Sequence, residues 1–159
     1  MPNPSQTSCT LALRLMLRLM LSGAAACSIY PVLTHAATLV SLACPVSVPA
    51  TSISLTAVPV GWTAYVNGPL YLSAAAPIDG APERKGQLVP SGEHTKKGQT
   101  TIVYRLEGNY PDGKWLQCSY GEHGEVTLSR KMDDSVSQCA FTYKKGSKAG
   151  QSDIHIACH

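Results

Sequence analysis

Four cysteines lie beyond the N-terminal leader of this chain, and each falls on the apolar phase of a segment that alternates like a β-strand. They are Cys44, Cys118, Cys139 and Cys158. Every second side chain of a strand points to the same face, so the alternation directs all four thiols toward a predicted core. In an exported chain such cysteines indicate disulfides rather than a metal site. The pattern therefore predicts a small β-domain that is stapled by two disulfides.

The first 36 residues read as a secretory signal peptide. Arg14 and Arg18 are the only charged residues before and within a mostly apolar run, 19–33. A basic start, an apolar centre and small residues before the cleavage point define such a signal. We place cleavage after Ala36, so residues 37–159 form one exported, β-rich domain of ordinary size.

An alternative interpretation of the leader is a lipoprotein signal. The run 24–27 ends in Cys27, which would then be acylated and would tether the domain to the outer membrane. The lipidation motif that ends in such a cysteine normally has a leucine-like residue at the position of Ala24. A membrane-spanning helix needs about 20 continuous apolar residues, and Arg18 and Pro31 leave fewer. We expect a soluble periplasmic protein that meets the membrane only if Cys27 is lipidated.

The charge of the exported domain is nearly balanced. The whole chain has 13 Lys and Arg against 10 Asp and Glu, and removal of Arg14 and Arg18 leaves 11 against 10, a net charge of +1. Nucleic acids are bound by concentrated basic surfaces. The composition therefore gives no reason to expect a nucleic-acid partner.

Short alternating segments, separated by turn residues such as those of 110–113, run through the exported part. No segment shows an apolar period of 3.6 over ten residues. A helical turn is expected at 74–76, and 77–98 is expected to be a mobile loop. The predicted strand segments are 40–48, 53–57, 62–66, 70–73, 100–107, 114–120, 125–130, 136–143 and 153–158. Short turns between sequential strands predict an all-β antiparallel fold, either a small sandwich or a partly open barrel.

The disulfide connectivity stays open, because four cysteines allow three pairings. We favour Cys118–Cys139 with Cys44–Cys158: the first closes a loop of about 20 residues, worth on the order of 3 kcal/mol, and the second ties the start of the domain to its end. In a plain meander, the 125–130 strand would separate Cys118 from Cys139 by about 9–10 Å, too far for a bridge. In that case Cys44–Cys118 and Cys139–Cys158 would form instead.

The sequence offers little for catalysis. It contains no Gly-x-Ser-x-Gly nucleophile motif, and the cysteines of the exported part are assigned to bridges. His155 and His159 share a strand face but lie about 13 Å apart, too far to hold one metal ion. Asp133 and Asp134 are neighbours on a turn and point apart. We expect no enzymatic activity, no metal and no cofactor.

Aromatic residues are the best candidates for binding a partner. Tyrosine and tryptophan are favoured where one end of the side chain is buried and the other is wet, as at binding surfaces. By strand phase, Trp115 lies on the face opposite to Cys118. We therefore predict Trp62, Tyr65 and Trp115 as partner-binding residues. The alternative is a second buried face in a two-layer sandwich.

A basic pair before glycine occurs three times, at 84–86, 96–98 and 144–146. Each is typical of an exposed turn. If several of these turns lie at one end of a sheet, they form a basic rim that is able to meet an acidic partner. The alternative is three independent, solvated turns.

Six sequence elements stand in a recognisable order: Cys44-Pro45, 59–62, 80–82, the run Trp115–Tyr120 with its Trp-Leu-x-Cys-x-Tyr pattern, 126–128 and Cys139. Together they resemble a family of small, largely uncharacterised exported proteins of Gram-negative bacteria. Some members are encoded beside type VI secretion toxins that attack the cell wall. Met132-Asp133 departs from the pattern, in which a Leu-Pro-like turn is expected.

The resemblance implies a non-enzymatic immunity protein or inhibitor that binds a cell-wall-active toxin or enzyme in the periplasm and occludes its active site. Such a domain would act mainly through surface complementarity to its partner, because it has no catalytic motif. One alternative is an envelope structural or binding protein of unknown ligand, lipid-anchored through Cys27. A third is a protein similar to the periplasmic lysozyme inhibitors.

Overall fold

The computed structural model describes residues 40–159, in which ten strands and two single-turn 3₁₀ helices form. The predicted signal peptide, 1–36, and the candidate lipidation site Cys27 lie outside the described residues. No helix within the described part has the length and apolar character needed to cross a membrane. The prediction of an all-β fold is confirmed.

The first sheet has five strands, and each neighbouring pair is antiparallel. Their order is β1 (Val40–Leu42), β10 (Ser152–Cys158), β9 (Gln138–Lys145), β6 (Gln99–Arg105) and β5 (Gly92–Lys96). β9 therefore lies between its successor in sequence, β10, and the distant β6.

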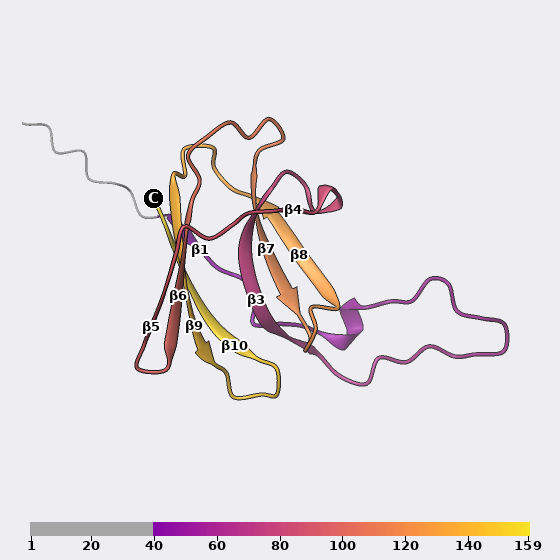
Figure 1. Cartoon of the computed structure of the whole chain (residues 1–159). Helices are drawn as coiled ribbons and strands as arrows, with labels where there is room; N and C mark the ends of the chain where they lie inside the picture. Colours follow the sequence, from indigo (N-terminus) through magenta and orange to yellow (C-terminus); the bar gives the residue numbers. More distant parts are fainter. Residues whose placement is uncertain (1–39) are drawn as a thin grey trace, which may run out of the picture. The chain divides into compact units, whose positions relative to one another are not determined.

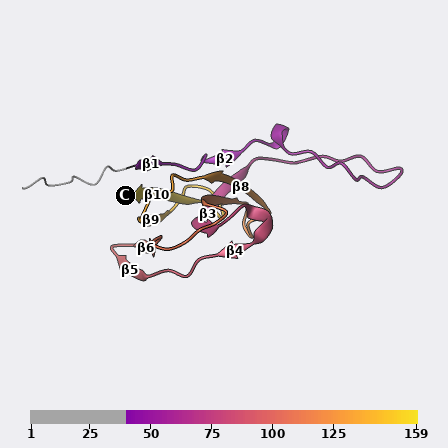
Figure 2. The same cartoon turned by 90° about the horizontal axis from the view of Figure 1, so that it is seen from above.

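The second sheet faces the first and is centred on the pair β3–β7. Its order is β2 (Ser47–Val48), β3 (Leu70–Asp79), β7 (Lys114–Tyr120) and β8 (Val126–Lys131), and β4 (Gly86–Gln87) pairs with the end of β3. The 3₁₀ helices are η1 (Ala50–Ser52) and η2 (Pro82–Arg84). Figures 1 and 2 show the two sheets as separate layers of a sandwich, and neither sheet closes into a barrel over residues 40–159.

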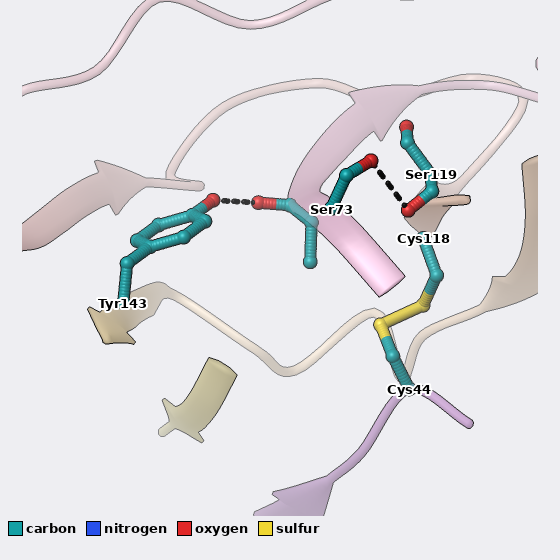
Figure 3. The surroundings of a disulfide bond; sticks show 6 residues. Cys44, Ser73, Cys118, Ser119 and Tyr143 are labelled. Carbon is teal, nitrogen blue, oxygen red and sulfur yellow. Dashed lines mark hydrogen bonds between the residues drawn. A yellow bond between two sulfur atoms is a disulfide. The ribbon is translucent and has the colours of Figure 1, made fainter. Parts of the chain in front are cut away.

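The core between the sheets follows from the alternation. In β7 every second residue is buried, including Leu116 and Tyr120, which are 0% exposed. From β9, Phe141 is also 0% exposed and meets Tyr104 of β6 edge to face, with ring centroids 5.6 Å apart. Aromatic pairs prefer this geometry. The Tyr143 side chain crosses the core, and its hydroxyl donates a hydrogen bond to the Ala75 carbonyl of the opposite sheet (Figure 3).

The four predicted cysteines form two disulfides, but the favoured pairing is wrong and the alternative pairing is the one observed. Cys44 bonds to Cys118, with Cα atoms 5.9 Å apart, and Cys139 bonds to Cys158, with Cα atoms 4.1 Å apart. Cys139 and Cys158 are direct partners in the β9–β10 register, whereas Cys118 lies in the other sheet. The reason is topological: after β8 the chain changes sheet, so Cys139 has a closer partner than Cys118.

Several local expectations are also wrong. Residues 53–57 and 62–66 form no strand, because no neighbouring strand pairs with them. The alanines of 74–76 lie inside β3 and pair with β7 instead of forming a helical turn. The stretch 77–98 is not an irregular loop, because it contains the end of β3, η2, β4 and β5.

Candidate functional site

A long excursion, here termed the arm, consists of residues 49–69 between β2 and β3. β2 pairs with the start of β3 through Ser47↔Tyr71 and Val48↔Leu70, so the two ends of the arm are held side by side. Figure 1 shows the arm extending away from both sheets. At its turn the Trp62 N–H donates to the Pro59 carbonyl at 3.1 Å, and Gly61 adopts a φ of 84°, which glycine tolerates without strain.

The arm exposes apolar side chains that the sandwich does not cover. Val60 is 103% exposed, Tyr65 84%, Trp62 76% and Leu55 59%. Soluble proteins seldom leave large apolar side chains gathered in one place unless the surface binds something. The arm therefore has the character of a binding element.

Trp62 and Tyr65, two of the predicted partner-binding residues, lie together. They line one shallow hollow of about 450 Å³ between the two limbs of the arm, with Leu55 and Val58. The sequence analysis missed Leu55, which it placed in a strand, 53–57, and it also missed Val58 and Val60 in the stretch that follows. Their signal was the density of prolines and glycines around them, at Pro59, Gly61, Gly68 and Pro69, which is typical of a loop.

Trp115, the third predicted residue, lies elsewhere. It is half-buried on β7, and its indole Nε1–H donates to the Asp112 carbonyl at 3.2 Å. Tyr120, at the other end of β7, pairs with Leu72 near the base of the arm. Trp115 lies five residue steps further along the strand, about 17 Å away. The structure thus brings Trp62 and Tyr65 together and separates Trp115 from them.

The base of the arm is fixed to the second sheet. The Cys44–Cys118 disulfide ties the chain to the middle of β7 just before β2, as Figure 3 shows. Beside it the Ser73 hydroxyl donates to the Ser119 carbonyl at 3.1 Å. The Gly121 N–H donates to the Tyr71 carbonyl at 2.9 Å. A base held in this way lowers the ordering cost of binding through the arm.

A second apolar hollow lies at this base. It has a volume of about 480 Å³ and is formed by the segment 45–54 and by Val126 and Leu128 of β8. Leu128 is 42% exposed, because β8 is the edge strand of its sheet. The apolar surface of the arm therefore continues onto the sandwich.

The charged groups of the described residues form no metal cluster of three or more His, Cys, Asp or Glu side chains. Hydrogen bonds from the Ser135 hydroxyl and N–H lower the pKa of the Asp133 carboxyl. Hydrogen bonds from the backbone N–H of Glu125 itself and from that of His123 lower the pKa of the Glu125 carboxyl. Both carboxylates are held in their charged form by their own turns. Burial raises the pKa of the Tyr143 hydroxyl, which crosses the core.

Comparison with protein families gives one match. The family model described as type VI secretion system Tli immunity protein matches residues 67–159, more than half of the chain. The match begins near the end of the arm and covers every element from β3 to β10. No match was found among curated proteins or among solved structures.

Proposed function

The chain belongs to the type VI secretion system Tli immunity protein family, and we propose that it neutralises a cell-wall-active toxin in the periplasm. Immunity proteins act by binding a protein toxin, so a protein partner follows from the family. The match over 67–159 is the observation that carries this function. The compartment, the substrate of the toxin and the contact residues are the parts that we propose.

The cysteines support a periplasmic location. All four cysteines of the described part are paired in disulfides, and disulfides form and persist in oxidising compartments. The predicted signal peptide, 1–36, would deliver the chain there. Lipidation at Cys27, the alternative, would leave the same domain in the periplasm but tether it to the outer membrane.

The arm supports inhibition by occlusion. Trp62 and Tyr65 would enter the active-site cleft of the toxin and exclude its substrate, because exposed aromatic anchors carry much of the affinity of protein interfaces. The base is already fixed by β2–β3 pairing and by the Cys44–Cys118 bridge. Trp115, at the far end of β7, stays a predicted contact outside the arm.

The test uses the purified domain 37–159 and, as the candidate toxin, any type VI secretion toxin whose gene adjoins its own. We expect a one-to-one complex, loss of peptidoglycan hydrolysis on binding, and at least about tenfold weaker inhibition with Trp62→Ala. Val89→Ala is the matched control, because Val89 is 87% exposed but lies outside the arm.

Two outcomes would contradict the proposal at different levels. A toxin that does not bind the domain would contradict the immunity role for this pair. A bound and inhibited toxin that hydrolyses phospholipid vesicles, but not peptidoglycan, would keep that role and overturn the cell-wall assignment.

A further inference from the structure

Two of the three basic pairs lie at one end of the first sheet. β6 pairs with β9 through Thr100↔Tyr143, which places the β5–β6 turn beside the β9–β10 turn. Figure 1 shows both turns at the same end of the sheet. Five exposed lysines, here termed the lysine rim, lie in the two turns and at the strand ends beside them: Lys96, Lys97, Lys144, Lys145 and Lys148.

The rim is not neutralised within the domain. Arg84–Asp112 is the one ion pair in the described part of the chain, and it lies at the third basic pair, far from the rim. The acidic residues beside the rim are Asp153, the register partner of Lys144, Glu122, which lies against Gly150 of the β9–β10 turn, and Glu93, three residues before Lys96 on β5. Five lysines against these three leave a surplus of two positive charges.

The sheet face beside the rim is shallow and polar. The Thr101 and Thr142 hydroxyls lie 3.0 Å apart at its centre. A depression of about 280 Å³ is lined by His94, Lys96, Lys97, Gln99 and Thr101. A neighbouring depression of about 510 Å³ is lined by Gln99, Thr142, Lys144, Asp153, Ile154 and His155. Such a face offers ammonium and hydroxyl donors to carboxylates.

The rim and the base of the arm lie at the same end of the domain. The Gly121 N–H bonds to Tyr71, the second residue after the arm. Next to Gly121, Glu122 lies against Gly150 of the β9–β10 turn, where an added Cβ would be 3.3 Å from the Glu122 Cα. Figure 1 shows the arm leaving from the end that carries both lysine turns.

We propose that the lysine rim is a second part of the toxin-binding surface and that it fits an acidic patch on the toxin. This inference rests on the proposed immunity function. The apolar arm and the charged rim would contribute differently: long-range attraction raises the association rate, whereas buried apolar contact slows dissociation. The toxin would therefore carry its acidic patch beside the cleft that receives the arm.

The test compares two variants with the same change in charge. The rim variant combines Lys96→Gln, Lys97→Gln, Lys144→Gln and Lys145→Gln. The control combines Lys85→Gln, Arg105→Gln, Arg130→Gln and Lys131→Gln, which are exposed and lie away from the rim. Each set includes one lysine with positive φ, Lys97 at 51° and Lys85 at 55°, so backbone effects are matched.

Stopped-flow binding to the candidate toxin is measured at low and high salt. We expect the rim variant to associate about tenfold more slowly at low salt and to lose most of the salt dependence, with dissociation nearly unchanged. The control should stay within about twofold of the wild type. Trp62→Ala should show the opposite result, faster dissociation with unchanged association.

Three results would overturn the inference, and they separate it from the proposed function. If the wild type does not bind the toxin, the result contradicts both the immunity role and the rim assignment. If the wild type binds and the two charge variants associate equally, only the rim assignment falls. If the rim variant instead loses binding to phosphatidylglycerol vesicles while toxin kinetics are unchanged, the rim serves a membrane and not a protein.

Discussion

The sandwich and the arm place similar residue types in opposite environments. Phe141 and Leu116 are 0% exposed between the sheets, whereas Trp62 and Tyr65 are 76% and 84% exposed on the arm. The two parts also differ in charge, because the arm contains no Lys, Arg, Asp or Glu. The sandwich gains stability from its apolar residues, but the arm gains almost none until something covers it. Stability and recognition are therefore carried by different parts of the chain.

The largest effect on stability is expected when one aromatic residue of each part is replaced by alanine. Phe141→Ala should lower the free energy of unfolding by about 3–5 kcal/mol, because it leaves a cavity in a core where Phe141 also meets Tyr104. Trp62→Ala should change it by less than about 0.5 kcal/mol. Denaturant unfolding with intact disulfides measures both. Similar losses for the two variants would show that the arm is packed in solution.

The next test removes each disulfide in turn. Cys44–Cys118 spans 74 residues and Cys139–Cys158 spans 19, so loop closure predicts losses of about 4 and about 3 kcal/mol respectively. The first bridge also holds the base of the arm, so Cys44→Ala/Cys118→Ala should weaken toxin binding as well. Cys139→Ala/Cys158→Ala is the matched control, which should lose stability alone. Equal weakening of binding by both pairs would mean that the bridge does not position the arm.

The pattern of local residues predicted the sandwich well and the arm badly, for a physical reason. In 114–120 and 153–158 the alternation coincides with strands that have partners on both sides. In 53–57 the same alternation forms no strand, because a strand is stabilised by its neighbours rather than by its own sequence. The alanines 74–76 show the converse, since pairing with β7 overrides their helix preference.

The candidate site was predictable in chemistry but not in geometry. Trp62 and Tyr65 follow from residue type, and the basic pairs follow from turn composition. That two of those pairs share one end depends on β9 lying beside β6, a contact between segments about 40 residues apart. The disulfide pairing depends on the change of sheet between β8 and β9 in the same way. Strand spacing named the observed pairing only as the alternative, and local patterns contain no signal for the sheet order that decides between the pairings.

A smaller effect is expected at a buried cation of the sandwich. Lys114 is 7% exposed, and its Nζ donates to the Asp134 carbonyl at 2.9 Å and to the Val136 carbonyl at 2.6 Å. Lys114→Met should cost about 1–3 kcal/mol of unfolding free energy, because these carbonyls lose their donor. Lys131→Met, at an exposed position on β8, is the control. Toxin binding through the arm should be unchanged, and a loss of binding in a folded Lys114→Met protein would contradict the separation of the two parts.

The smallest effect is a dependence on pH that belongs to the sandwich alone. The Ser135 hydroxyl and N–H hold the pKa of Asp133 below its ordinary value of 3.8. A carboxyl whose pKa is lower in the folded state stabilises the fold above the unfolded pKa and loses that contribution as pH falls through the folded pKa. We therefore expect a weak loss of stability below about pH 4. An NMR titration of Asp133 should show the lowered pKa, and Ser135→Ala should move it back toward 3.8. The arm has no carboxylate to titrate, so a pH-dependent change of the Trp62 environment in step with Asp133 would mean that the arm and the sandwich are coupled.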